Sequence, residues 1–374
     1  MQINFKNNFR NYWRNVDKKI LFCFILLFIL GLFFSFSSTS SLAGERLNKN
    51  YYFFFSKHLI FSLSSIGIMI FISLIDENIL KKSITPLFII FFLLLVLVPL
   101  IGVEVKGAKR WLNLHLFRLQ PIELLKPLFV LITAKILLSN SKKVTNSSYF
   151  FSFLILLSII IFLVNQPDVG QSILLIGTWM SLVFISGIAI IYIVSFLSTF
   201  IFSVAALLFL FPDKFGYITR RLITFIDPSK GDSFQSAKAL DAIRQGGLKG
   251  QGMGEGTLKD KVPEAHTDYI IAVITEEYGS IISILIVSIF LYITYRIIKI
   301  CMKKNNDNIK VALSGLSSLL IFQTFIHIGV NTSLLPTTGM TLPFLSYGGS
   351  SLIGSAVLAG VILNYTKNRI NNDE

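Results

Sequence analysis

Long apolar runs alternate with short polar segments along almost the whole chain. Ten of these runs come close to or exceed the roughly 20 apolar residues that cross ~30 Å of hydrocarbon as a helix. They cover about residues 20–38, 52–75, 84–103, 121–138, 149–165, 169–187, 189–211, 268–299, 310–333 and 343–365. The pattern predicts an all-α membrane protein in which about ten transmembrane helices form one polytopic domain over residues 1–374.

Composition and charge agree with a membrane protein. Hydrophobic residues make up 53% of the 374 residues and charged residues only 14%, against about 25% in soluble domains. The net charge of +14 would suggest nucleic acid for a soluble protein, but the Lys and Arg residues lie mostly between the apolar runs. There they act as topology signals and contacts with lipid headgroups. The Lys and Arg residues are most frequent in the N-terminal segment and in the loops after even-numbered runs, so we expect both termini in the cytoplasm. Because the positive charge is explained by membrane topology, we expect no nucleic-acid partner.

The segment 212–267 is the only sizeable polar region, and the charge pattern places it on the outer side. Glycine is frequent in its last part, at 246–256. We therefore expect one large extracytoplasmic loop between the seventh and eighth helices. The eighth run, 268–299, is longer than a straight crossing needs, which predicts that its cytoplasmic end projects into water.

The motif Pro263–Asp268 enters the eighth run and offers the first candidate for chemistry. Asp268 lies where the polar loop meets the bilayer, a partly desolvated position that suits a general base. His266 could share or relay the proton. The structural alternative is that Thr267 or Asp268 simply caps the helix.

A second candidate, Gln120–Lys126, opens the fourth run. Glu123 and Lys126 lie three residues apart on one helix face, so they can pair inside the membrane. Intramembrane charges are costly and usually face a polar interior. The Glu123–Lys126 pair could contribute to substrate binding, or it could be a structural ion pair that holds helices together.

Two cations precede this motif. Lys109 and Arg110 stand beside Trp111 at the outer interface, where they could hold a pyrophosphate headgroup. Alternatively, the three residues anchor the chain at headgroup depth.

Two further acidic motifs accompany the apolar runs. Asp168 follows Gln166 and Pro167 in a tight outer turn, where it could cap the sixth helix or line a cavity. Glu276 and Glu277 lie inside the eighth run and must find partners. Lys126 is a candidate partner for them.

The segment 335–351, which includes Ser346 and Gly348, carries two prolines and several glycines. Such backbone at membrane depth is tolerated where it is buried in protein or lines a watery cavity. No spacing of His, Cys or acidic residues resembles a zinc or iron site.

These motifs occur in the order in which the SEDS family (shape, elongation, division and sporulation proteins) carries them, and the chain resembles that family over nearly its whole length. The division-type branch is more similar than the elongation-type branch. The segments that carry the resemblance are 107–111, 120–126, 166–170, 227–256, 263–268, 276–277 and 335–351.

The resemblance implies a peptidoglycan glycosyltransferase that polymerises lipid II during cell division, on the outer face of the bacterial cytoplasmic (inner) membrane. Asp268 matches the catalytic aspartate, which would deprotonate the GlcNAc 4-hydroxyl for an inverting displacement of undecaprenyl pyrophosphate. Substrate-binding residues would be Lys109, Arg110, Gln120, Glu123, Lys126 and His266. Supporting residues would be Asp168, Glu276, Glu277, Ser346 and Gly348.

The resemblance also implies partners. They are a class B penicillin-binding protein (an FtsI-like transpeptidase), other divisome proteins, membrane lipids, lipid II and the undecaprenyl-pyrophosphate-linked glycan. It allows for a divalent cation, Mg²⁺ or Mn²⁺, although the sequence shows no ligand set for one. The alternatives are a lipid II flippase, an elongation-type polymerase and a scaffold that only positions a transpeptidase. A base at the outer boundary is needed only by a polymerase.

Overall fold

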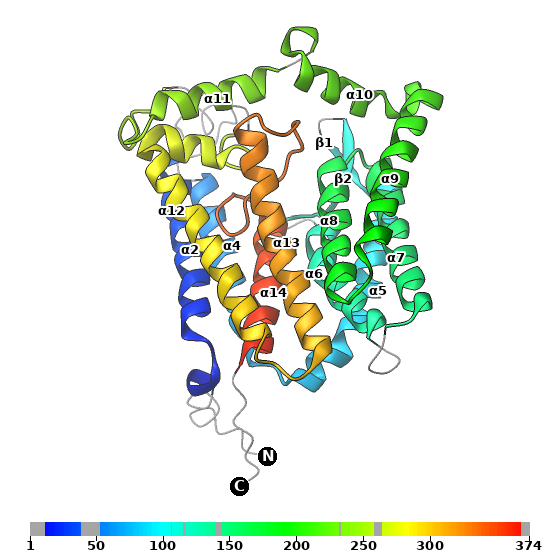
Figure 1. The fold of residues 1–374 in the computed structure, drawn as a ribbon. Coiled ribbons are helices and arrows are strands. Elements are labelled where there is room, and N and C mark those ends of the chain that lie inside the picture. Colours follow the sequence, from blue (N-terminus) through cyan, green and yellow to red (C-terminus); the bar gives the residue numbers. More distant parts are fainter. Residues whose placement is uncertain are drawn as a thin grey trace.

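The protein is a bundle of long helices with shorter elements across one end (Figure 1). The computed structural model describes residues 12–38, 53–105, 107–114, 117–138, 144–231, 233–257 and 264–367. The two ends of the described chain meet at the opposite end of the bundle, where the Lys367 ammonium lies 5.5 Å from the Tyr12 ring centroid.

Ten helices occupy the predicted apolar runs. They are α2 (Lys18–Ser38), α4 (Phe53–Leu74), α5 (Glu77–Ile101), α6 (Pro121–Leu137), α7 (Asn146–Asn165), α8 (Val169–Ile185), α9 (Ile190–Leu210), α12 (Ile270–Cys301), α13 (Asp307–Asn331) and α14 (Gly349–Thr366). Eight of them are long and apolar enough to cross a membrane. The other two, α6 and α8, have 17 residues each. The predicted helical membrane fold is confirmed.

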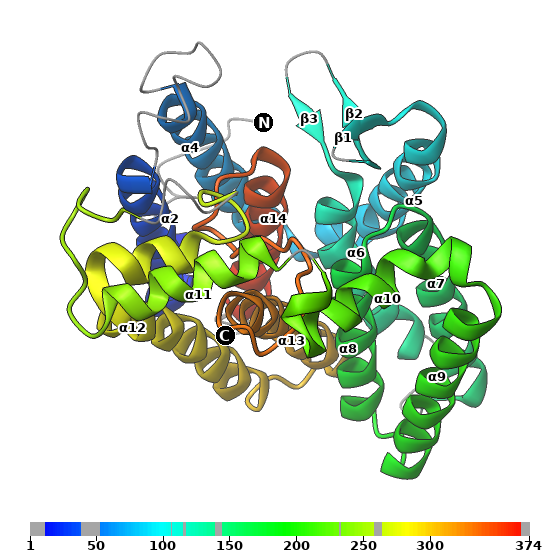
Figure 2. The same ribbon diagram turned by 90° about the horizontal axis from the view of Figure 1, so that it is seen from above.

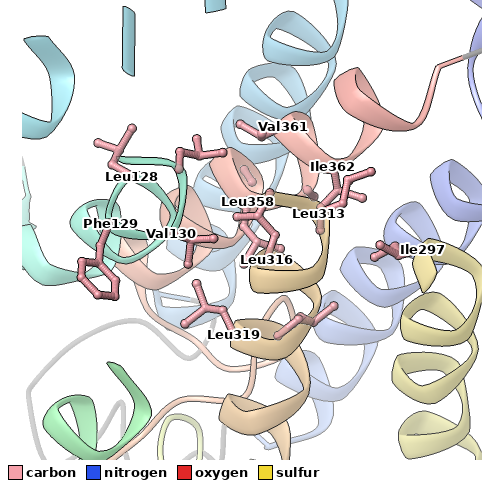
Figure 3. Close-up of a cluster of buried hydrophobic side chains, with 14 of the residues drawn as sticks. Leu128, Phe129, Val130, Ile297, Leu313, Leu316, Leu319, Leu358, Val361 and Ile362 are labelled. Carbon is pink, nitrogen blue, oxygen red and sulfur yellow. The ribbon is translucent and has the colours of Figure 1, made fainter. Parts of the chain in front are cut away.

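The core lies where α6, α13 and α14 meet. Figure 3 shows one cluster of their buried side chains together with Ile297 of α12. The labelled residues of these three helices are Leu128, Phe129, Val130, Leu313, Leu316, Leu319, Leu358, Val361 and Ile362. In α14, 83% of the apolar window is buried inside the protein, against 0% in α9. Helix α14 is therefore central, and α9 presents its apolar side chains outward.

Helix α12 is broken at Gly279, whose φ of 83° and ψ of 166° are not helical. A Cβ at this position would clash with the carbonyl oxygen of Leu248, so glycine allows a close backbone approach. The first part of α12 packs along α11, and the rest descends into the bundle (Figures 1 and 2). The expectation that the cytoplasmic end of this helix projects into water is corrected. The excess length of α12 lies instead before the break at Gly279, where the helix packs along α11.

A small antiparallel sheet between α5 and α6 was not predicted. It consists of β1 (Val103–Val105), β2 (Ala108–Asn113) and β3 (Arg118–Leu119), in the order β1-β2-β3 (Figure 2). Gly107 turns the chain between β1 and β2 with a φ of +78°. The strands are too short for the alternation of side chains to stand out beside the long apolar runs.

The polar segment 212–267 is largely helical where it is described. It contains α10 (Pro212–Ile226), the short 3₁₀ helix η1 (Pro228–Lys230) and α11 (Phe234–Gly246). These elements lie across the end of the bundle at which α12 begins (Figure 1).

Candidate active site

Asp268 lies in a turn just before α12. The backbone amides of Thr267 and Asp268 both donate to the Glu264 carbonyl, at 3.0 and 3.1 Å. The N-cap residue of α12 is Tyr269, with no side-chain cap. The capping alternative for Thr267 or Asp268 therefore does not describe this helix start.

The segment 335–348 holds this turn from the other side. Ser346 Oγ donates to the Thr267 carbonyl at 2.6 Å and accepts from the Leu342 amide at 2.8 Å. The Tyr347 amide donates to the His266 carbonyl at 2.9 Å. Ser346 is thus a bridge between two motifs that are far apart in the sequence.

The carboxylate of Asp268 rests against the backbone of the same segment. A Cβ at Gly339 would lie 3.2 Å from Asp268 Oδ2, and Gly339 has a φ of +68°. The Asn331 side-chain amide donates to the Asp268 carbonyl at 3.1 Å. Asp268 itself is half-buried. We call Asp268, Gly339, Asn331 and Ser346 the rim site, in which hydrogen bonds hold the backbone and Asp268 is only half-buried.

His266 packs among aromatic rings. Its ring centroid lies 5.4 Å from Phe54 and 5.7 Å from Tyr347. A proton relay through His266 stays a prediction. Gly348, the other predicted supporting residue of this segment, is the N-cap residue of α14.

A second polar group lies inside the bundle. Lys126 and Glu123 form an ion pair of 2.8 Å, with side chains 3% and 5% exposed. Gln171 donates to Glu123 at 2.7 Å, and Lys126 donates to Gln323 at 3.1 Å. These four residues are the interior cluster. The predicted Glu123–Lys126 pairing is confirmed, and each member has an additional partner, as a buried charge requires.

The predicted pairing of Lys126 with Glu276 or Glu277 is wrong, because Lys126 is taken up by the interior cluster. Both glutamates are buried under the glycine-rich part of segment 212–267. The amides of Gln251 and Gly252 donate to the Glu276 and Glu277 carbonyls, at 2.9 and 3.0 Å.

The glycines of this stretch have a packing role that sequence reasoning missed. A Cβ at Gly256 would lie 2.9 Å from the Glu276 carboxyl carbon, and a Cβ at Gly250 would clash with the Glu277 carbonyl. Clustered glycines beside a helix are the signal of such a close backbone approach.

Lys109 and Arg110 do not act as a joint pair of cations, because successive strand residues point to opposite faces. Lys109 is exposed, whereas Arg110 turns toward the α7–α8 turn. Arg110 donates to the carbonyls of Gln166 (2.9 Å) and Pro167, and its Nε lies 3.9 Å from Asp168 Oδ2.

Asp168 caps α8, as one of the two alternatives predicted. Its Oδ1 accepts from the Gln171 amide at 3.4 Å, and its Oδ2 lies 3.4 Å from the Gln120 side-chain amide, which donates to it. Burial raises the pKa of the Asp168 carboxyl, and the positive charge of Arg110 acts against this rise.

The residues described here contain no group of three or more His, Cys, Asp or Glu side chains that could hold a metal ion. The divalent cation implied by the family resemblance therefore has no protein ligand set in that part of the chain. We derive no step through a metal.

Comparison with known proteins identifies the family. Residues 17–371 match the family model FTSW_RODA_SPOVE, described as cell cycle protein. The chain belongs to this family. The prediction of SEDS membership is thereby confirmed, since FtsW and RodA are SEDS proteins.

Similar members of the FtsW/RodA/SpoVE family carry informative names. The chain is 32% identical to "Probable peptidoglycan glycosyltransferase FtsW" of Caulobacter vibrioides, over 96% of this chain and 91% of that protein. It is 34% identical to the protein of the same name in Geobacter sp. strain M18, over 93% and 96%. A solved structure described as "Structural coordination of polymerization and crosslinking by a peptidoglycan synthase complex" matches with a TM-score of 0.75 at 22% identity, over 94% of this chain and 97% of that one.

Proposed function

We propose that this family member is a peptidoglycan glycosyltransferase of the FtsW type, which polymerises lipid II during cell division. The observation that carries the proposal is the rim site. Asp268, in the place where the family resemblance puts the catalytic base, is half-buried and its carboxylate lies beside Gly339. The names of the similar proteins support the same activity.

Charge and topology support a proposed orientation of the chain. The two described ends meet at one end of the bundle, and the start of α12, which follows Asp268, lies with α10 and α11 at the other (Figure 1). Lys and Arg residues gather in the N-terminal segment and in the loops after even-numbered spans. By the positive-inside rule that side faces the cytoplasm, so Asp268 and segment 212–267 face the periplasm.

In the proposed reaction Asp268 removes the proton from the GlcNAc 4-hydroxyl of lipid II. The oxygen then attacks the anomeric carbon of the growing glycan, and the bond to undecaprenyl pyrophosphate breaks with inversion. Positive charge stabilises the leaving pyrophosphate as its negative charge develops. Strand β2, which carries Arg110 and the exposed Lys109, lies at the same end of the bundle as the start of α12, which follows Asp268 (Figure 1).

The other candidate residues have different proposed roles. Gln120 and His266 lie at the substrate end of the bundle, where Gln120 bonds Asp168 and His266 packs on Tyr347. Glu123 and Lys126 are too deeply buried in the interior cluster to touch a substrate in this conformation. We assign them to positioning the helices beneath the site.

The proposed partner is a class B penicillin-binding protein of the FtsI type, which would crosslink the new strands. The similar synthase complex supports this partner, because its description couples polymerisation with crosslinking. Other divisome proteins and membrane lipids complete the proposed surroundings.

The test uses the full-length protein purified with its transpeptidase and labelled lipid II. A general base contributes about 10²- to 10⁴-fold in rate, so Asp268→Asn is expected to abolish strand formation while the protein stays folded and partner-bound. The matched control is Asp213→Asn, an exposed carboxylate of α10, which should polymerise normally. Wild-type rates in Asp268→Asn would disprove the catalytic assignment.

A lipid II translocation assay in vesicles tests the flippase alternative. The interior cluster argues against that alternative, because its charged groups are closed on one another rather than lining an open path. Translocation by a protein that forms no glycan would reverse the conclusion.

A further inference from the structure

Helix α10 presents one polar face to the membrane-spanning helices. Tyr217 and Arg221 lie four residues apart, so they share a helix face. The Tyr217 hydroxyl donates to the Val164 carbonyl at 3.2 Å, and Arg221 Nη1 donates to the Thr337 carbonyl at 3.2 Å. Arg220 is exposed beside them.

Arg221 and Arg110 lie on two different elements and both influence the Asp168 carboxylate electrostatically. Arg110 reaches Asp168 from β2, and Arg221 lies within the electrostatic reach of both residues. Burial lowers the pKa of the Arg221 guanidinium, the charge of Arg110 lowers it further, and Asp168 raises it. Two guanidinium groups thus lie in the neighbourhood of one buried carboxylate, so positive charge exceeds negative charge there.

Arg221 also retains hydrogen-bonding capacity. A guanidinium has five N–H donors, and Arg221 uses one of them among the described residues, for the Thr337 carbonyl. A planar fork of donors with spare capacity matches the oxygens of a phosphate group.

The position of Arg221 is close to the proposed base. Thr337, which Arg221 binds, precedes Gly339 by two residues, and two residues span at most ~7 Å. The Asp268 carboxylate rests on Gly339. Tyr269 is influenced by both charges: burial raises its pKa, Asp268 raises it further and Arg221 lowers it.

We infer that Arg221, together with Arg110, binds a phosphate group of the lipid-linked pyrophosphate beside Asp268. This inference rests on the proposed function for the identity of the ligand. It adds a contact from α10, which makes the amphipathic helix of segment 212–267 part of the substrate site. Arg221 holds the leaving group, and Asp268 acts on the hydroxyl that attacks.

The experiment measures equilibrium binding of undecaprenyl pyrophosphate to the full-length protein with its transpeptidase. Arg221→Gln is expected to weaken binding about 10- to 100-fold, the effect of losing charge-assisted hydrogen bonds. Arg220→Gln makes the same charge change at the exposed neighbour and should alter binding about twofold or less. Uncharged undecaprenol should bind wild type and Arg221→Gln equally.

Arg221→Lys addresses the geometry, because lysine keeps the charge without the planar fork. It should bind undecaprenyl pyrophosphate more weakly than wild type and more tightly than Arg221→Gln. In polymerisation assays the loss should appear first as a higher KM for lipid II. If Arg221→Gln does not fold, wild-type affinity in Arg221→Lys would overturn the inference by itself.

Three outcomes would overturn the inference. The first is unchanged affinity in Arg221→Gln, and the second is an equal loss in Arg220→Gln, which would indicate general attraction. The third is equally strong competition by phosphatidylglycerol vesicles, which would indicate a site for phospholipid headgroups. The binding assay does not depend on turnover. Normal polymerisation by Asp268→Asn would therefore refute the proposed base but would leave the inference about Arg221 unaffected.

Discussion

The interior cluster and the rim site hold charge in opposite ways. In the interior cluster the Glu123–Lys126 pair is almost fully buried, and an amide side chain supports each member. In the rim site the backbone around Asp268 is fixed by Ser346 and Asn331, while the carboxylate is half-buried against Gly339.

This difference in burial distinguishes charged residues that stabilise the fold from charged residues that can take part in catalysis. A buried pair whose partners lie within the protein keeps its position but has nothing to offer a substrate. A base must instead reach the proton that it removes, with its geometry held by surrounding groups. Of the two charged sites, only the rim site, with its half-buried Asp268, meets that requirement.

The largest expected effect on stability lies in the interior cluster. Lys126→Met leaves the Glu123 carboxylate buried without its cation, which should cost about 3–5 kcal/mol in free energy of unfolding. The double variant Glu123→Gln/Lys126→Met removes both charges and should recover most of the loss. Denaturation in detergent micelles measures both. The comparison of the two sites breaks down if Asp268→Asn destabilises the protein as much as Lys126→Met does.

The glycine-rich part of segment 212–267 packs against the start of α12, which follows Asp268. Gly250→Ala combines a φ of +81° with a clash against the Glu277 carbonyl, so a loss of about 2–4 kcal/mol is expected. Gly254 has a φ of +82° but open space at its Cβ, and Gly254→Ala should cost only about 1 kcal/mol. Equal thermal stabilities of the two variants would contradict the close packing.

Lys109 and Arg110 of β2 show the same contrast between a charge that is bonded within the protein and a charge that is exposed. Arg110→Gln removes the bonds to the α7–α8 turn and should cost about 1.5–3 kcal/mol, with weaker lipid II binding. Exposed Lys109→Gln should change stability by about 0.5 kcal/mol or less. The two variants are compared by thermal unfolding and by the KM for lipid II. Identical behaviour would mean that the two faces of β2 are not distinct.

Apart from the control variants, the smallest expected effect on stability concerns the support of the rim site. Ser346→Ala removes the bonds to the Thr267 carbonyl and the Leu342 amide, which should cost about 1–2 kcal/mol. Because Asp268 would then be held less firmly, kcat should fall while partner binding is preserved. A variant that loses stability but keeps the wild-type kcat would show that Ser346 does not position the base.

The sequence by itself determined what depends on nearby residues. Apolar runs of membrane-crossing length predicted the positions of the ten helices because burial in lipid depends on local composition. The spacing of Glu123 and Lys126 predicted their ion pair, since three residues bring two side chains to one helix face. The cap of α8 by Asp168 was one of two alternatives predicted from the sequence, because capping also depends on neighbouring residues.

Only the tertiary structure decided which distant segments meet. Asp268 rests on Gly339, and Arg221 binds Thr337, through contacts between elements that no local periodicity describes. The break at Gly279 likewise follows from the approach of another backbone rather than from its own neighbours. Spacing along one helix sets which side chains share a face, but the packing of helices and loops sets what that face touches.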